Sequence, residues 1–498
     1  MLADFEIIAS IDLADVNQNT HSVYQYLTQY RRDVFESQQR VVFYTNSKPS
    51  QDLLNHIQKA ITLIDISNYF VLFCCPYNIK DMLNSARQLH GNDAVCMHWL
   101  EMFTVNAKPL KADQFVVYTE KLCPMPWMHV QVDNQGQYHT CCVYQGDMGS
   151  VADYTPQEFF NSDQLTDVRK RFLDGEKLSE CSYCWNAEDH GTISNRQRHI
   201  KSYGKQFLTT WINQPEIKTI DFRPGNVCNF KCRICDPSNS SKVAEENFKF
   251  EKNNTQSVFL LETIKQGRWF DNNPKFIESL IELLPNIVNM DFYGGEPFLL
   301  KQLPTLLKRI VDDNHCDHIR LHFNTNGSVY PTQIINLLNQ FQSIDIAISI
   351  DDIQQRFEYQ RGGIWSEVEK NIIQMNQLTH SRFKVYIFTT VNIQNVLYLD
   401  KLYAWADSLG LEVVLNLLEF PKHLNIDFVT TAARDLIYQK YHNHSNIELQ
   451  KIAQRIQHAT GHDGIEFVSY MKTLDQRRNQ NFSLEHQAIA IPMGYMLN

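Results

Sequence analysis

The chain has 498 residues, which is long enough for about three domains with separate hydrophobic cores. Hydrophobic residues make up 43% and charged residues 20%, with 18 Gly and 16 Pro, a composition typical of a globular protein. A net charge of -10 without a basic stripe argues against nucleic acid as a partner. The first residues are acidic and the most apolar run, 69–76, is too short to span a bilayer, so we expect a cytoplasmic protein with no membrane span.

Residues 1–110 alternate short apolar runs with amphipathic stretches. Three amphipathic stretches predict helices, and four apolar runs predict strands: FEIIASI, RVVFYT, FVLFCC and AVCMHWL. This pattern indicates an N-terminal α/β module. No glycine-rich fingerprint follows its first strand, so nothing indicates a nucleotide, and docking or packing is the simplest role.

Residues 118–205 form a second predicted domain. Two apolar runs, WMHVQV and QYHTCCV, flank Asp133-Asn134-Gln135-Gly136, which predicts a β-hairpin. One helix is expected over TPQEFFNSDQLTDVRKRFL, before a pair of cysteines at Cys181 and Cys184.

Residues 215–420 alternate strand and helix patterns again. Six strands are predicted: TIDFR, NMDFYG, IRLHFN, IDIAISI, KVYIFTTV and EVVLNLL. Helical patterns between successive strands imply parallel pairing in a sheet or barrel, with the chemistry at the strand carboxyl ends. Residues 421–498 are mostly helical in pattern and are expected to cap the barrel.

Twelve cysteines in a cytoplasmic chain are expected to be reduced, so their clusters favour metal ligands over disulfides. Cys228, Cys232 and Cys235 follow the first strand of the predicted barrel in C-x3-C-x2-C spacing. Three thiolates on one loop can hold three irons of a cubane cluster and leave the fourth iron open to a small chelating ligand. A zinc site is the alternative, although zinc usually takes four protein ligands.

These residues resemble the radical S-adenosylmethionine (SAM) superfamily, which carries the same cysteine loop after the first strand of a partial (β/α)6 barrel. The resemblance continues at the ends of later strands, in Tyr293-Gly294-Gly295-Glu296-Pro297, Asn324-Thr325-Asn326-Gly327, Ser349-Ile350-Asp351 and Arg361-Gly362-Gly363. The SAM-binding residues that it implies are Gly294, Gly295, Glu296, Asn326, Ser349, Asp351 and Arg361. The residue before the third cysteine is often aromatic in this superfamily and here is Ile234, so adenine stacking is expected to be weaker or supplied elsewhere.

The resemblance implies a reaction class. A one-electron donor, such as a flavodoxin or ferredoxin, reduces a [4Fe-4S] cluster, and the electron cleaves SAM to methionine and a 5′-deoxyadenosyl radical. That radical abstracts a hydrogen atom from the substrate, while the protein supplies orientation and excludes water.

A second set of cysteines lies in the middle segment, at Cys123, Cys141, Cys142, Cys181 and Cys184. Four thiolates can enclose a second cubane, although four cysteines with one C-x2-C pair also describe a structural zinc site. If Cys141 and Cys142 share a strand, only one of them points inward, and we predict that it is Cys141.

The middle segment is similar to the twitch domain, the shortened SPASM domain that holds one auxiliary four-iron cluster in radical SAM enzymes. The resemblance includes Gly191-Thr-Ile-Ser-Asn-Arg196 and the late Leu474-Asp475-Gln-Arg-Arg478. It implies an auxiliary [4Fe-4S] cluster on Cys123, Cys141, Cys181 and Cys184. Full ligation by four cysteines favours electron relay over direct substrate binding.

Side chains for the proton chemistry have no motif of their own. Tyr293, His322 and Glu419 lie near strand ends and are candidates for a general base, with a structural role as the alternative. Four further histidines, His442, His444, His458 and His462, are expected at the surface.

We therefore expect a radical SAM enzyme whose auxiliary cluster aids oxidation or bond formation on a small molecule, such as a carbohydrate. One alternative is a peptide maturase that recognises its substrate through residues 1–110, although that segment does not resemble the winged helix known for leader binding. The other is a catalytically silent iron-sulfur or metal-binding protein.

Overall fold

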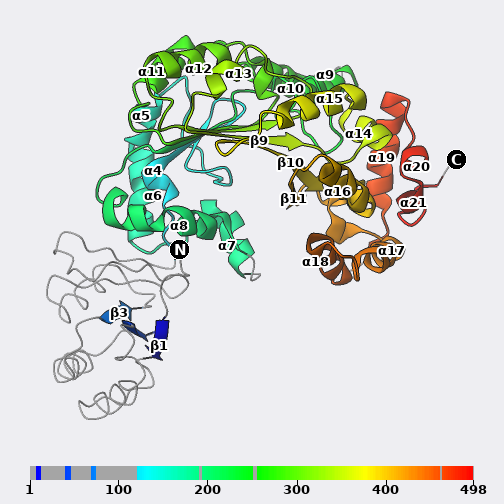
Figure 1. The fold of residues 1–498 in the computed structure, drawn as a ribbon, viewed down its shortest axis with the longest axis horizontal. Coiled ribbons are helices and arrows are strands. Elements are labelled where there is room, and N and C mark those ends of the chain that lie inside the picture. The colour runs from blue at the N-terminus through cyan, green and yellow to red at the C-terminus, as the bar shows by residue number, and fades with distance from the viewer. Residues whose placement is uncertain are drawn as a thin grey trace. The chain divides into compact units, whose positions relative to one another are not determined.

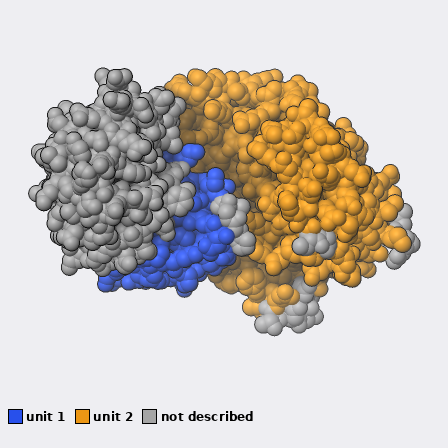
Figure 2. Space-filling view, turned by 90° about the horizontal axis from the view of Figure 1, so that it is seen from below, with its two compact units in different colours: residues 1–130, 139–148, 157–218 blue, residues 131–138, 149–156, 219–498 orange. Residues whose placement is uncertain are grey.

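The computed structural model describes residues 7–12, 40–45, 69–73, 121–189, 193–250, 255–459 and 462–496. The chain divides into two compact units, shown in Figure 2. The first comprises residues 1–130, 139–148 and 157–218, and the second comprises residues 131–138, 149–156 and 219–498. The four-domain division expected from the sequence stays a prediction.

Three parallel strands near the N-terminus form one small sheet in the order β1-β2-β3. They are β1 (Ile7–Asp12), β2 (Arg40–Thr45) and β3 (Tyr69–Phe73). These are the first three predicted strands, so three of the four strands expected in this segment are confirmed. The fourth predicted strand and the three predicted helices lie outside the described residues.

The main sheet has eight strands in the order β11-β10-β9-β8-β7-β6-β4-β5. Six of them are parallel and confirm the six predicted strands: β6 (Thr219–Phe222), β7 (Asn289–Phe292), β8 (Arg320–Thr325), β9 (Ser343–Ser349), β10 (Phe383–Val391) and β11 (Val413–Leu417). The strand order runs open from β11 to β5, so the sheet is a partial barrel and the predicted fold class is confirmed.

One face of this sheet is aromatic and packs under helices. The register sets Phe222, Phe292 and Phe323 side by side, with ring centroids 5.5 Å and 4.9 Å apart. The helices α11 (Pro274–Ile281), α12 (Leu303–Asp312) and α13 (Ile335–Leu338) lie along this sheet (Figure 1). Because side chains alternate along a strand, the residues before these phenylalanines face the opposite side.

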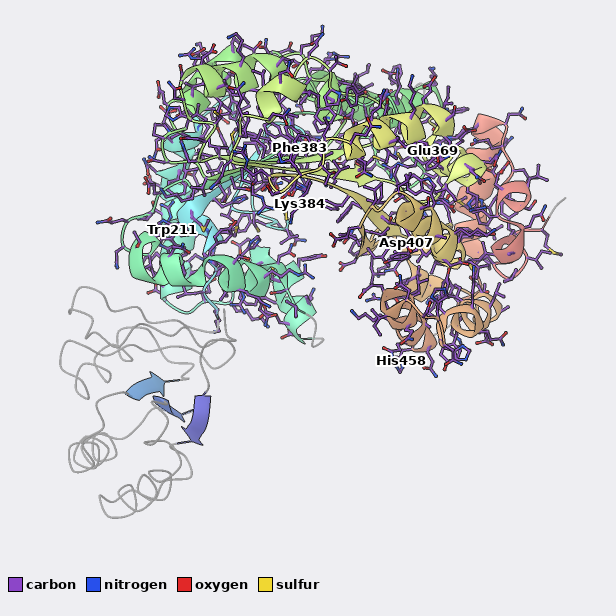
Figure 3. The ribbon with its side chains drawn as sticks, in the orientation of Figure 1. Trp211, Glu369, Phe383, Lys384, Asp407 and His458 are labelled. Carbon is purple, nitrogen blue, oxygen red and sulfur yellow. The ribbon has the colours of Figure 1, made fainter. Side chains whose placement is uncertain are left out.

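Further helices connect the parallel strands. Between β6 and β7 lie α9 (Ser241–Phe250) and α10 (Thr255–Gln266), together with α11. Between β9 and β10 lie α14 (Gln354–Arg361) and α15 (Trp365–Asn376), and α16 (Leu399–Ser408) precedes β11. Figure 3 labels Phe383 and Lys384 at the start of β10, where the buried ring and the exposed amine show the alternation of a half-buried strand.

The predicted hairpin is confirmed as β4 (His129–Val132) and β5 (Tyr138–His139). Asp133 closes its turn, because its backbone N–H donates to the Gln137 carbonyl and its carboxylate accepts from the backbone N–H groups of Gln135 and Gln137. β5 ends at His139, so Cys141 and Cys142 lie beyond the strand, and the condition that they share a strand is not met.

The single helix expected after the hairpin is two helices, α5 (Pro156–Phe160) and α6 (Asp163–Leu173). Ser162 separates them because its hydroxyl accepts from the backbone N–H of Leu165 and caps α6. The same unit contains α4 (Met125–Met128), α7 (Ser182–Asp189) and α8 (Asn195–Gln206), where Ser194 and Gln197 form a capping box.

The C-terminal region is helical, as predicted. It contains α17 (Thr431–Tyr441), α18 (Ile447–Gln457), α19 (Ile465–Arg478), α20 (Phe482–Glu485) and α21 (Gln487–Ala490). Among the described residues, no helix combines the length and apolar character needed to cross a membrane.

Candidate functional site

Cys228, Cys232 and Cys235 lie on the loop that follows β6, at the carboxyl ends of the parallel strands. Cys228 and Cys232 are buried and Cys235 is half-buried. The backbone N–H of Cys228 donates to the hydroxyl of Ser241, at the start of α9, over 3.2 Å. The three predicted ligands of the barrel cluster therefore share one loop beside a helix start.

The electrostatic surroundings of these thiols suit a cationic ligand. Burial, together with the nearby Cys232, raises the pKa of the Cys228 thiol to about 12. Burial also raises the pKa of Cys232 and Cys235, while the guanidinium of Arg361 lowers the pKa of all three thiols. Metal ions bind the thiolate and displace its proton, so iron would supply the positive charge that stabilises the three thiolates.

Gly294 and Gly295 follow β7 with φ angles of +72° and +57°, a backbone conformation that favours glycine. A Cβ on Gly294 would come within 2.2 Å of the Asn134 Oδ1, and one on Gly295 within 2.5 Å of the Val227 carbonyl oxygen. The turn thus packs directly against the backbone that leads into the cysteine loop.

Glu296 is fully buried, and its carboxylate forms hydrogen bonds with other groups of the protein. Its oxygens accept from the hydroxyl of Thr325 over 2.8 Å and from the backbone N–H of Asn326 over 2.7 Å. Its own N–H donates to the Val227 carbonyl over 2.7 Å. Glu296 therefore joins the ends of β7 and β8 to the cysteine loop.

Asn326, at the end of β8, lies against the same loop. Its amide Nδ2 donates to Cys228 Sγ over 3.7 Å and to the side-chain oxygen of Asn229 over 2.9 Å. Two predicted SAM residues, Glu296 and Asn326, thus contact each other and the cysteine loop.

Ser349 ends β9 and is half-buried, and Asp351 and Arg361 follow as a buried ion pair. Arg361 Nη1 lies 2.6 Å from Asp351 Oδ2, while Arg361 Nε is buried without a hydrogen-bond partner among the described residues. Burial opposes the charge of Arg361, but Asp351 and Cys232 outweigh it and raise the pKa of the guanidinium. A buried cation with one unpaired donor is suited to an anionic ligand group.

The four cysteines predicted for the auxiliary cluster line one small cavity in the first unit. Cys123 and Cys184 are buried, and Cys141 and Cys181 are half-buried. Cys142 is exposed, is not among the lining residues, and accepts from Asn195 Nδ2 over 3.8 Å. The structure thus brings Cys123, Cys141, Cys181 and Cys184 together around one cavity, and Cys142 is not among its lining residues.

Arg196 and His199 line the same cavity. Arg196 is buried, its Nη2 lies 2.6 Å from Glu188 Oε2, and it lowers the pKa of Cys123 and Cys181 against the larger effect of burial, which raises both. Burial lowers the pKa of His199 to about 4, so its imidazole is neutral at pH 7. Arg196 is the cation of this site.

Both cysteine sets fit iron-sulfur clusters by their donors. Among the described residues, no three His, Cys, Asp or Glu side chains converge as the ligands of a single metal ion do. A cubane spreads its thiolate ligands over several irons and therefore needs a wider arrangement. Three thiols leave one iron open, and four thiols complete the coordination.

The inner face of the barrel carries the candidates for proton chemistry. Tyr293 and His322 lie together, with ring centroids 5.3 Å apart, whereas Glu419 is exposed beyond β11. Asp221 and Asp291, which no sequence motif singled out, pair in register on β6 and β7. The signal was present, because both strands end in Asp-Phe and the phenylalanines face the helices.

Three of the four C-terminal histidines, His442, His458 and His462, are exposed, and His444 is half-buried. Figure 3 labels His458, just after α18. They show no metal-binding arrangement within the described part of the chain.

Several solved structures share limited similarity with the chain. Streptococcus suis SuiB bound to S-adenosylmethionine is 12% identical, with a TM-score of 0.30 over 58% of this chain and 64% of SuiB. SuiB bound to the precursor peptide SuiA is 12% identical, with a TM-score of 0.27 over 50% and 56%. TYW1 with a lysine-pyruvate adduct is 16% identical, with a TM-score of 0.25 over 48% and 71%. No curated protein sequence matches the chain significantly.

Two family models match the chain itself. The radical SAM superfamily model matches residues 222–404, which include the C-x3-C-x2-C loop, and the SPASM iron-sulfur cluster-binding domain model matches residues 123–185, which include the four cavity cysteines. The cofactors that these domains bind are S-adenosylmethionine with a [4Fe-4S] cluster and an auxiliary iron-sulfur cluster. The chain therefore contains a radical SAM domain over residues 222–404 and a SPASM-like iron-sulfur cluster-binding domain over residues 123–185.

Proposed function

We propose that the chain is an enzyme that binds a [4Fe-4S] cluster on Cys228, Cys232 and Cys235 and abstracts a hydrogen atom from its substrate. When bound, the cluster and SAM supply a 5′-deoxyadenosyl radical. The observation that carries this proposal is the placement of three thiols on one loop at the strand carboxyl ends, beside a buried Arg361 with an unpaired donor.

The residues around the loop divide the binding of SAM between them. Arg361 is proposed to receive the carboxylate of SAM through its unpaired Nε, while Asp351 fixes the guanidinium. Ser349, at the end of β9, is proposed to contact SAM as well. Gly294 and Gly295 are proposed to receive the amino group, because a turn without side chains lets a ligand approach the backbone.

Glu296 and Asn326 are proposed to hold the backbone and the cysteine loop around the SAM site in place. The buried carboxylate of Glu296 holds the backbone of Asn326, and the amide of Asn326 reaches Cys228.

The cavity in the first unit is proposed to hold the auxiliary [4Fe-4S] cluster on Cys123, Cys141, Cys181 and Cys184. Four thiolates leave no iron open, which favours electron relay. Arg196 would offset part of the negative charge of the four thiolates. A flavodoxin- or ferredoxin-type protein is the proposed electron donor.

The polar groups on the inner face of the barrel favour a small polar substrate, such as a carbohydrate. This substrate is proposed to undergo oxidation or bond formation. Asp221, Asp291 and His322 share one register row on this face. Carboxyl groups and an imidazole form hydrogen bonds with hydroxyl groups, and one of them that is unprotonated would take the proton that the substrate releases.

The test is the release of 5′-deoxyadenosine from SAM by anaerobically reconstituted protein with dithionite. We expect release from the wild type and from Cys316→Ala, a half-buried cysteine outside both sets, but not from the Cys228/Cys232/Cys235→Ala variant. Release that survives in the triple variant, or its absence from the wild type, contradicts the proposal. A product found on a peptide instead of a sugar in substrate extracts would support the maturase alternative.

A further inference from the structure

Arg233 lies inside the cysteine loop, directly after Cys232, and is fully enclosed by the protein. Its Nη2 donates to Asp475 Oδ1 over 2.6 Å and to Gln480 Oε1 over 2.9 Å, and its Nε donates to the Tyr359 carbonyl over 3.1 Å. The guanidinium carbon lies 3.7 Å from the centre of the Tyr359 ring. Two acceptors of this guanidinium, Asp475 and Gln480, thus belong to the C-terminal segment.

Asp475, on α19, collects four donors at its buried carboxylate. Besides Arg233, it accepts from the hydroxyl of Tyr359 over 2.7 Å, from the backbone N–H of Phe482 over 2.7 Å and from the hydroxyl of Tyr495 over 2.6 Å. Asp475 therefore joins the cysteine loop to α14, to α20 and to the residues after α21.

Two further contacts join α19 to the loop and its flanking helix. The hydroxyl of Tyr470 donates to the backbone carbonyl of Arg233 over 2.5 Å. Arg478 pairs with Glu246 on α9 over 2.7 Å, and Glu246 in turn pairs with Lys231, the residue before Cys232, over 3.0 Å. These contacts reach both residues that flank Cys232.

We infer that the C-terminal segment 465–495 positions the C-x3-C-x2-C loop for cluster binding, with Asp475, Tyr470 and Arg478 as positioning residues that act through Arg233 and Lys231. The inference rests on the proposed cluster site. It gives a role to the Leu474–Arg478 stretch, which lies 239 or more residues beyond the cysteines in the chain.

The test compares two tyrosine variants in a chain that carries only the barrel cluster, made by replacing Cys123, Cys141, Cys181 and Cys184 with alanine. Tyr470→Phe removes only the hydroxyl that binds the loop. Tyr441→Phe is the matched control, because its hydroxyl binds Asp400 over 3.3 Å on α16, away from the loop. The readouts are the rate of iron loss to a chelator under anaerobic conditions and the change in the EPR signal of the reduced cluster when SAM is added.

We expect Y470F to lose iron about fivefold faster than its parent, the effect of one hydrogen bond, with an altered EPR response to SAM. Asp475→Asn, which removes a buried charge pair, is expected to lose iron about tenfold faster or more. Y441F is expected to match its parent. If D475N does not fold, the result for Y470F alone tests the positioning role.

A second comparison uses a chain that carries only the auxiliary cluster, made by replacing Cys228, Cys232 and Cys235 with alanine. The same variants in this chain distinguish a loss of loop positioning from a general loss of stability. We expect equal rates of iron loss there for all variants. Equal rates for Y470F and its parent in the barrel-cluster chain, or equal acceleration for both clusters, would overturn the positioning role. A parent barrel-cluster chain that binds no iron would overturn the proposed function instead.

Discussion

Asp221→Asn probes the buried carboxyl on the inner face of the barrel. Asp221 is 6% exposed, and its Oδ1 has no hydrogen-bond partner among the described residues. Burial raises the pKa of this carboxyl from 3.8 to about 7, Arg223 lowers it, and Asp291 raises it. A protonated Asp221 is therefore favoured in the folded state up to neutral pH.

The sign of the pH dependence follows from this shift. Between about pH 4 and pH 7 the folded protein binds a proton that the unfolded chain releases, so stability falls as pH rises through this window. A pKa difference of about three corresponds to roughly 4 kcal/mol. Asparagine does not titrate, so the advantage of D221N in the free energy of unfolding is expected to grow from near zero at pH 4 to roughly 4 kcal/mol at pH 8.

Urea unfolding of the apoprotein at several pH values measures this difference through tryptophan fluorescence. Asp407→Asn is the control for the replacement of an aspartate, since Asp407 is exposed on α16 (Figure 3). A D221N advantage that stays constant from pH 4 to pH 8 would refute the reasoning, because the buried carboxyl would then not titrate differently in the two states.

Three further predictions concern the binding sites. Gly295→Ala brings a Cβ within 2.5 Å of a backbone oxygen at positive φ, so we expect a loss of about 1–3 kcal/mol and a lower thermal midpoint; an unchanged midpoint would argue against a rigid turn. Cys141→Ser is expected to lower auxiliary iron while Cys142→Ser leaves it unchanged, and the reverse result would exchange the two ligands. Arg361→Lys is expected to weaken SAM binding about tenfold in equilibrium dialysis, and binding equal to the wild type would remove Arg361 from the site.

The strands of the barrel were predictable because their periodicity is local. Phe222 and Phe292 each follow an aspartate, and the alternation of buried and exposed side chains continues along β10. The break between α5 and α6 at Ser162 and the early end of β5 were not predicted. A cap or a turn can end a helix or strand while the apolar pattern of the sequence continues. The cysteine loop was found because its ligands are close in sequence.

The contacts behind that loop could not be predicted in the same way. Arg233 and Asp475 are 242 residues apart, and no spacing rule joins them. The Asp221 and Asp291 pair was also missed, because it depends on the register of β6 and β7 and not on either strand alone. Local motifs thus revealed the predicted metal ligands, whereas the residues around them emerged only from the fold.

The most direct test of the account measures iron and 5′-deoxyadenosine together in the wild type and in the Cys228/Cys232/Cys235→Ala variant. Two cubane clusters predict about eight irons per chain in the wild type and about four in the variant, with nucleoside formed only by the wild type. Equal iron in both proteins, or nucleoside from the variant, would contradict the assignment of the radical-generating cluster to these three cysteines.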